Sequence, residues 1–177
     1  GYPLYLLLTK LFTFIPFGEM AWRVNVGTAV YALAAVVILY ELLRRLTGQP
    51  LAALAAALTF GLTPTFWSQA VAAEVYTLHS LMVVLALFLM REVGRWRLEI
   101  GDWGVWKSND SRLMIKEWQR NMVALAFVLG LGLTNHLTTI ILIPPAILTV
   151  FFAWLPNRHS PIPNPKSLLT LFLAFFL

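Results

Sequence analysis

Residues 24–43 read VNVGTAVYALAAVVILYELL, a stretch whose only charged side chain, Glu41, stands near its end. A helix of this length and composition is sufficient to cross the hydrocarbon core of a bilayer, which requires ~20 apolar residues. Arg44 and Arg45 follow the stretch, and the turn sequence TGQP at 47–50 ends it. The stretch therefore predicts a membrane-spanning helix in an all-α membrane protein.

The composition of the whole chain agrees with a membrane protein. Of its 177 residues, 59% are hydrophobic and 12% charged, and the charged share is about half that of a soluble domain. The net charge is +5, but the basic residues form no long block or stripe, so no nucleic-acid partner is predicted. The chain contains no Cys, which excludes disulfides, thiolate metal sites and cysteine nucleophiles.

Four more apolar stretches predict membrane helices, at 51–66, 70–93, 121–134 and 137–155. We expect the polar pair Asn135-His136 to form a turn, and Pro144-Pro145 to kink the last helix. Residues 121–155 could instead hold one long tilted span with a re-entrant piece. The five helices occupy 24–155 with a cytoplasmic connector at 94–118. Residues 156–166 then form a cytoplasmic loop, and 167–177 start a further, truncated span.

The basic residues predict the orientation of these helices. If the spans alternate, eleven of the thirteen Lys and Arg residues fall on one side, and only Lys10 and Arg23 fall on the other. Loops rich in Lys and Arg stay in the cytoplasm. The side that carries 1–23, 66–73 and the Asn135-His136 turn is therefore expected to face outward.

The first 23 residues are expected to lie on this outer surface. Apolar side chains within 1–17 recur at helical spacing beside Thr9 and Lys10, which predicts an amphipathic helix on the membrane surface; the apolar set is Tyr5, Leu8, Phe12 and Ile15. Pro16 and Gly18 are expected to end the helix. The alternative is the tail of another span, which Lys10 in the middle disfavours.

Polar residues at expected helix ends give the functional candidates. An ionisable side chain near the membrane costs roughly 2 kcal/mol or more unless it is paired or hydrated, so Arg23, Glu74 and His136 stand out. The alternative interpretations are a helix N-terminal acid for Glu74 and a turn residue at the lipid headgroups for His136. Tyr76, His79 and Ser80 share one helical face by their spacing, and we expect His79 to be a hydrogen-bonded packing residue rather than a ligand.

Motifs of soluble enzymes do not occur in the sequence. There is no GxSxG, P-loop or HExxH pattern, and three His without any Cys give little support for a metal site. We therefore predict no metal ion and no cofactor.

Four strings carry a resemblance to a known family. They are GYPLYLLLTKLFTFIPFG (1–18), AWRVN (21–25), FWSQAVAAEVYTLHSL (66–81) and GLGLTNHLTT (130–139). In this order they resemble a bacterial membrane family of unknown function that is related to protein O-mannosyltransferases of the GT-C superfamily. The resemblance implies a multi-pass helix bundle in the bacterial inner membrane. It also implies an enzyme that transfers a sugar, mannose in its relatives, from a polyprenyl-phosphate donor to a protein or glycan acceptor on the outer face.

The chemistry implied by this resemblance suggests roles for the polar residues. A polyprenyl chain needs an apolar groove, its phosphate needs Arg or Lys donors, and a sugar needs aromatic, amide and carboxylate partners. The residues that could supply these contacts are Arg23 for the phosphate and Asn25, Trp67, Gln69, Glu74, Tyr76, Asn135 and His136 for the sugar or acceptor.

The catalytic acid of the family cannot be assigned in this chain. The resemblance implies that it acts as a catalytic base or a metal-independent activator within an Asp-Ser-Gly-Glu-like stretch ahead of a His-Pro-Pro-Gly-Tyr-Pro segment. This sequence begins at Gly1-Tyr2-Pro3. Glu19 is not a safe substitute, and Glu74 is the candidate within the chain. We therefore expect a fragment of a larger membrane protein that has no transferase activity by itself.

Two other classes of protein fit the apolar composition. A transporter or flippase requires polar residues at mid-span, and Thr59 is one of the few that come near this position. A non-catalytic subunit of a membrane complex, in which His79 or His136 ligates a pigment or haem, would absorb visible light.

Overall fold

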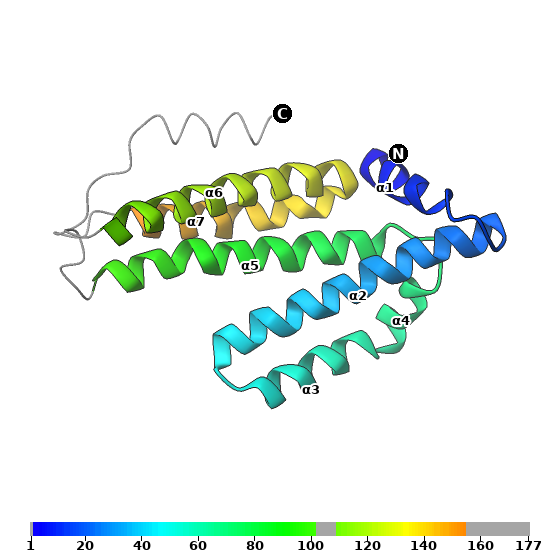
Figure 1. The fold of residues 1–177 in the computed structure, drawn as a ribbon, viewed down its shortest axis with the longest axis horizontal. Helices are drawn as coiled ribbons and strands as arrows, with labels where there is room; N and C mark the ends of the chain where they lie inside the picture. Colours follow the sequence, from blue (N-terminus) through cyan, green and yellow to red (C-terminus); the bar gives the residue numbers. More distant parts are fainter. Residues whose placement is uncertain (1, 102–108, 155–177) are drawn as a thin grey trace. The chain divides into compact units, whose positions relative to one another are not determined.

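The computed structural model describes residues 2–101 and 109–154, which form helices and no strand (Figure 1). The all-α fold class is thereby confirmed. The helices are α1 (Pro3–Phe12), α2 (Met20–Thr47), α3 (Pro50–Gly61), α4 (Pro64–Ala70), α5 (Tyr76–Gly101), α6 (Asn109–Asn135), the 3₁₀ helix η2 (Leu137–Leu142) and α7 (Ile143–Trp154). The expected loop 156–166 and further span 167–177 lie outside the described residues.

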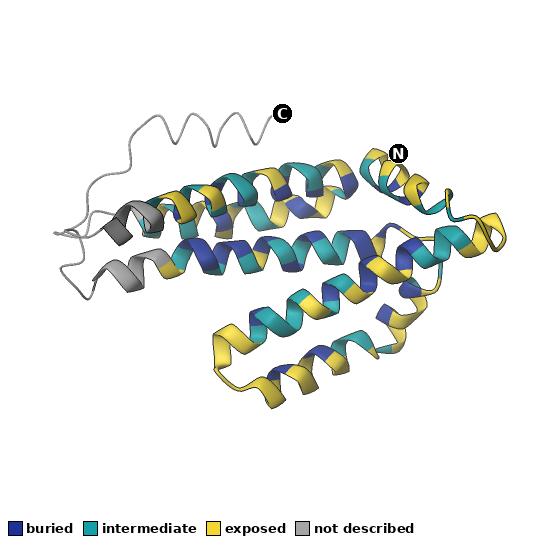
Figure 2. Cartoon of the chain, viewed as in Figure 1, coloured by how far each residue is buried: buried dark blue, intermediate teal, exposed yellow. Residues whose placement is uncertain are grey.

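Two of the described helices are long and apolar enough to cross a membrane, α2 and the Tyr76–Arg95 part of α5. The pair α3 and α4 bends by 67° at its break and has the composition of a broken span or a re-entrant segment. Large apolar side chains on α2 and α3 are exposed (Figure 2), among them Leu33 at 65% and Leu51 at 81%. Such exposure suits contact with lipid, and the helices indicate an integral membrane protein.

The contacts divide the chain into two units, and every candidate site residue lies in the first. Unit 1 comprises Gly1–Leu85 and Leu131–Thr139, and unit 2 comprises Ala86–Gly130 and Ile140–Leu177. In unit 1, α1, α3 and α4 pack on α2. The core of unit 1 uses small residues, Ala32, Ala35 and Ala70, around Phe66, which allows the helices to approach closely.

Helix α1 packs on α2 through a partly polar face. The Tyr5 hydroxyl lies 3.4 Å from the Thr28 hydroxyl, and Thr9 lies 3.5 Å from the Tyr31 hydroxyl. Leu6, Leu7 and Leu11 are exposed instead. A helix in the expected N-terminal segment is confirmed, and it ends at Phe12. Its expected apolar face is the more buried one, because Tyr5 is buried and Leu8 and Phe12 are half-buried, but Thr9 is buried beside them.

The helix expected at 51–66 is broken. Thr63 is extended (φ −59°, ψ 139°), and Pro64 starts α4 in its first turn. A residue before proline avoids the helical conformation, and proline at a first turn loses no helical hydrogen bond. The chain therefore turns after Gly61 and begins a new short helix.

The helix expected at 70–93 is shifted along the chain. Helix α4 ends at Ala70, residues 71–75 form turns, and α5 begins at Tyr76. The expected range 70–93 put Glu74 inside the first turns of the helix, and this is wrong because Glu74 precedes α5.

The turn at Asn135-His136 is confirmed, because α6 ends at Asn135 and η2 begins at Leu137. The helix expected at 137–155 changes type just before its prolines, because the 3₁₀ helix η2 ends at Leu142 and α7 begins at Ile143. Pro144 and Pro145 lie in the first turn of α7, where proline is tolerated, and the expected kink stays a prediction. Gly132 permits the close approach of η2, since a Cβ there would lie 2.7 Å from Cγ2 of Thr139.

Unit 2 packs the second part of α5 with α6 and α7. Its buried residues include Ala86, Val93, Met122, Leu125 and Ala146. The expected connector at 94–118 is largely helical, because α5 continues to Gly101 and α6 begins at Asn109. Only residues 102–108 of this connector lie outside the described residues.

Candidate functional site

Two histidines lie together in unit 1, where α5 begins and α6 ends. The ring centroids of His79 and His136 are 4.7 Å apart. The Tyr76 ring lies 5.9 Å from that of His136, and the Tyr2 ring stacks on it at 6.2 Å with an interplanar angle of 10°. With Thr138, these residues form a group that we call the histidine cluster.

Thr138 connects the two histidines through hydrogen bonds. Its hydroxyl lies 2.7 Å from Nδ1 of His136 and 2.9 Å from Nε2 of His79. Its backbone N–H also donates to Nδ1 of His136 at 3.3 Å. Residues almost sixty positions apart in the chain are therefore held in one polar group.

Asn135 ties the end of α6 to the start of α5. Its side chain is 1% exposed, and its Nδ2 donates to the Val75 carbonyl at 3.5 Å. The same carbonyl accepts the His79 backbone N–H at 3.0 Å, so Asn135 contacts the chain at the entry to α5. The site therefore includes the turn that carries Glu74.

Several buried polar atoms in unit 1 have no hydrogen-bond partner among the described residues: Gln69 Oε1, Thr77 Oγ1, His79 Nδ1, Asn135 Oδ1 and Thr139 Oγ1. Buried polar groups are normally hydrogen-bonded to protein or water. Their presence in one unit indicates a region that can offer hydrogen bonds to water or to polar atoms of a ligand.

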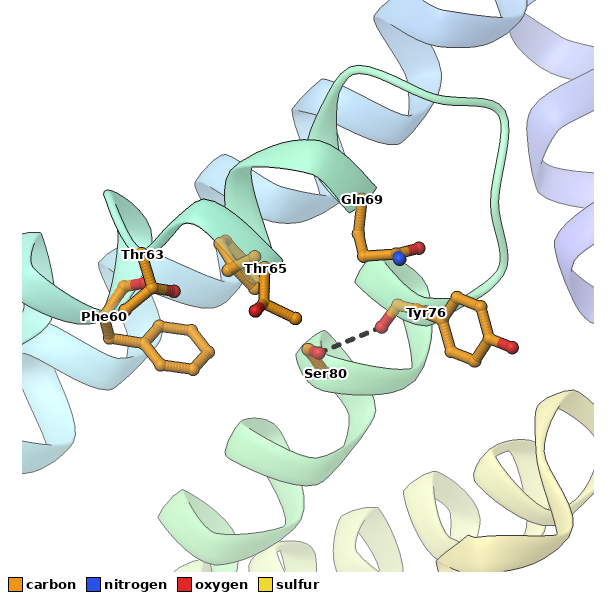
Figure 3. Close-up of a pocket in the computed structure, with 7 residues that line it drawn as sticks. Phe60, Thr63, Thr65, Gln69, Tyr76 and Ser80 are labelled. Carbon is orange, nitrogen blue, oxygen red and sulfur yellow. Dashed lines mark hydrogen bonds between the residues drawn. The ribbon is translucent and has the colours of Figure 1, made fainter.

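A pocket of about 440 Å³ lies beside Tyr76 (Figure 3). We call it the α4 pocket, and it is lined by Phe60, Thr63, Thr65, Phe66, Gln69, Tyr76 and Ser80. Phe60 and Phe66 form an aromatic wall with ring centroids 4.5 Å apart. Figure 3 shows Gln69 reaching from α4 toward the start of α5, where the Ser80 hydroxyl donates to the Tyr76 carbonyl at 2.9 Å.

The α4 pocket thus combines an apolar wall with hydroxyl and amide groups, the combination that small-molecule sites use. Tyr76 belongs to both the pocket and the histidine cluster. The structure therefore brings Gln69, Tyr76, Asn135 and His136 into one region of unit 1.

Glu74 lies in the turn between α4 and α5, and its side chain is exposed. Its backbone N–H donates to the Ala72 carbonyl at 2.8 Å. The following residue, Val75, is the one that Asn135 contacts. The carboxylate is therefore carried by a short turn whose end is fixed to the site.

Arg23 binds the backbone of the loop between α1 and α2. Its Nε donates to the carbonyls of Phe17 and Gly18 at 3.1 and 3.0 Å, and its Nη1 donates to that of Thr13 at 3.0 Å. Gly18 has a positive φ of 78°, and a Cβ there would lie 2.6 Å from the Trp22 ring. Arg23 thus has a structural role that the sequence did not reveal, and its role as a phosphate partner stays a prediction.

We expect Arg23→Lys to lower the melting temperature of the native protein, by which we mean the natural membrane protein that contains this chain. Lysine keeps the charge but lacks the planar fork that reaches three carbonyls, and the loss of such bonds costs about 1–3 kcal/mol. Thermal unfolding followed by tryptophan fluorescence would measure the change. Arg120→Lys is the control, because Arg120 makes an exposed ion pair with Glu117 at 3.4 Å. An unchanged melting temperature for Arg23→Lys would contradict the structural role.

Asn25 and Trp67 are placed differently from the other candidates. Asn25 is half-buried near the start of α2, and Trp67 is 56% exposed on α4. Neither side chain lines the α4 pocket. The contacts predicted for them with a substrate stay predictions.

The sequence interpretation missed Thr138 and the part played by Tyr2. Thr138 follows His136 by two positions, a spacing at which a side chain commonly bonds local backbone, and this signal could have identified it. No local signal links Tyr2 to His136, because their contact depends on the tertiary fold. His79 is confirmed as a hydrogen-bonded residue.

Among the described residues, no three His, Cys, Asp or Glu side chains gather as a metal site would require. The two clustered histidines therefore lack a third ligand of these types within that part of the chain.

Comparisons with known proteins identify relatives of this chain. The family described as the Protein O-mannosyl-transferase TMEM260 N-terminal domain matches residues 1–159. The mouse Protein O-mannosyl-transferase TMEM260 is 30% identical over 176 residues, which cover 99% of this chain and 22% of the mouse protein. The chain thus spans about a fifth of that curated relative. No solved structure matches it.

Proposed function

The chain belongs to the TMEM260 N-terminal domain family of protein O-mannosyl-transferases, and from this premise we propose that it is part of an integral-membrane glycosyltransferase. The proposed enzyme has the multi-pass GT-C architecture. It transfers a sugar, with mannose the first candidate, from a polyprenyl-phosphate donor to a hydroxyl of a protein or glycan acceptor.

The main support for this proposal is the meeting of two polar segments that are far apart in the sequence. The polar residues of 66–81 and 130–139, far apart in sequence, meet in unit 1 through the bonds of Thr138 with His79 and of Asn135 with Val75. The α4 pocket adds an apolar aromatic wall beside them. A donor with a lipid, a phosphate and a sugar needs such a mixed surface.

The proposed reaction is a substitution at the anomeric carbon. The acceptor oxygen attacks this carbon, the bond to the phosphate oxygen breaks, and the lipid phosphate leaves with the electron pair. A base takes the proton of the acceptor hydroxyl. Within this chain Glu74 is the candidate base, His136 and Asn135 are sugar or acceptor contacts, and Arg23 is the candidate phosphate partner.

The donor class is tested by offering two forms of labelled mannose to the reconstituted native protein. We expect label to reach a protein acceptor from polyprenyl-phosphate mannose and not from a nucleotide-linked mannose. Label transferred only from the nucleotide form would contradict the proposed donor. Movement of the lipid-linked sugar across the membrane without transfer would support a flippase instead.

We place the site on the outer face of a bacterial inner membrane, because eleven of the thirteen basic residues fall on the opposite side if the predicted spans alternate. In a Cys-free background, Ser68→Cys on α4 should react with an impermeant thiol reagent in intact cells. Ser108→Cys, outside the described residues, should react only after permeabilisation. Labelling of Ser108→Cys together with protection of Ser68→Cys would reverse the orientation.

A further inference from the structure

The contacts of Thr138 determine which nitrogen of His136 carries a proton. The backbone N–H of Thr138 points at Nδ1 of His136 at 3.3 Å. A backbone N–H can only donate, so Nδ1 must be an acceptor with a free electron pair. A neutral His136 therefore has its proton on Nε2.

The same reasoning gives the direction of the bonds between the two histidines. A hydroxyl has a single proton to donate, and the short 2.7 Å contact with the unprotonated Nδ1 of His136 requires that proton. The oxygen of Thr138 must then accept from Nε2–H of His79 at 2.9 Å. Each hydrogen bond in this row therefore points the same way: His79 donates to Thr138, and Thr138 donates to His136.

The last donor in this row of hydrogen bonds is the Nε2–H of His136. This N–H has no acceptor among the described residues, whereas Nδ1 of His136 accepts from both the hydroxyl and the backbone N–H of Thr138. The ring is bordered by Tyr2 and Tyr76, whose side chains are 43% and 46% exposed. A fixed N–H donor beside exposed aromatic rings suits an oxygen acceptor on a sugar or phosphate.

We propose that Thr138 and His79 are positioning residues, which hold His136 with its proton on Nε2 so that this N–H donates to an oxygen of the lipid-phosphate sugar donor. This inference rests on the proposed function for the identity of the ligand. The arrangement within the protein does not depend on that identity. Thr138 acts through His136, and His79 acts through Thr138.

The arrangement is tested without any activity measurement. Nitrogen NMR of ¹⁵N-histidine-labelled native protein in lipid distinguishes the two tautomers, and the spectrum of His136→Asn identifies the His136 signals. We expect protonated Nε2 and unprotonated Nδ1 in the wild type. Thr138→Ser should keep this pattern, and Thr138→Val should add the other tautomer. Protonated Nδ1 in the wild type, or identical His136 signals in all three proteins, would overturn the proposal.

The role in the reaction is tested by the same pair of variants. Because Thr138→Val loses one hydrogen bond, we expect it to reduce kcat/KM for the donor about fivefold to tenfold. Thr138→Ser keeps the hydroxyl, so its kcat/KM should stay close to the wild-type value. Thr59→Val removes a hydroxyl that, within the part of the chain that the structure describes, bonds only the Ala55 carbonyl of its own helix. This variant should leave kcat/KM unchanged. Equal values for Thr138→Val and Thr138→Ser would overturn the role.

Two ligands distinguish the oxygen that His136 contacts. If Thr138→Val weakens inhibition by polyprenyl phosphate, the contact is to the phosphate. If inhibition is unchanged and only the KM of the sugar-bearing donor rises, the contact is to the sugar. A wild-type protein that transfers no sugar but shows the expected histidine signals would contradict the proposed function and leave the arrangement standing.

Discussion

Glu74→Gln should reduce sugar transfer by the native protein at least about tenfold, a loss of about 1.4 kcal/mol of transition-state stabilisation. Glutamine keeps the volume and much of the hydrogen bonding of glutamate but cannot accept a proton as a base. Because the side chain is exposed in a turn, its replacement should change the free energy of unfolding by less than about 0.5 kcal/mol.

Transfer rate and thermal unfolding must be measured on the same preparations of Glu74→Gln. Glu117→Gln is the matched control, since Glu117 is exposed on α6 and pairs only loosely with Arg120. A normal transfer rate for Glu74→Gln would show that Glu74 has no role in the reaction. A transfer rate that falls only in proportion to the amount of folded protein would lead to the same conclusion.

Asn135→Asp should be strongly destabilising, because it replaces the Nδ2 donor with an oxygen facing the Val75 carbonyl at a position that is 1% exposed. A buried, unpaired polar group costs about 1–3 kcal/mol, and a charged one costs more. Asn135→Leu removes the bond without adding a charge, so we expect an intermediate loss. The melting temperatures of the two variants and of the wild type show whether Asn135→Asp is the less stable variant, as we expect.

The same exchange at Asn25, which is half-buried on α2, provides the control for Asn135. Asn25→Asp should cost less stability than Asn135→Asp. Equal melting temperatures for wild type and Asn135→Asp would show that the contact with Val75 does not hold the two helix ends together. The turn carrying Glu74 would then lack the support described above.

The longest helix was predictable from the sequence, and the helix breaks were not. Residues 24–43 predict α2 because a stretch of twenty mostly apolar residues with one charged side chain is long enough to cross a bilayer as a helix. The turn at 71–75 was missed because Ala72 and Ala73 favour helix by propensity, which tertiary contacts override. A single helix was expected over 137–155, whereas the structure changes from a 3₁₀ helix to an α-helix after Leu142 and has Pro144-Pro145 in the first turn of α7.

The sequence predicted several residues of the candidate site but not the hydrogen bonds and ring contacts between them. Tyr76, Asn135 and His136 were identified as polar residues at helix ends, and they meet in unit 1. Sequence could not give the bonds of Thr138 or the stacking of Tyr2, since these depend on how distant segments fold together. Arg23 was identified by its charge, but its partners are backbone carbonyls, which no side-chain pattern reveals.

We propose that the lipid-phosphate sugar donor binds beside Tyr76, between the α4 pocket and the histidine cluster. The binding place can be found with a polyprenyl-phosphate mannose analogue that carries a photoreactive diazirine in its first isoprene unit and is irradiated with the native protein in lipid. We expect cross-links within residues 60–80 or 131–139, suppressed by unmodified donor and not by a nucleotide-linked mannose. Suppressible cross-links found only outside both segments would contradict it.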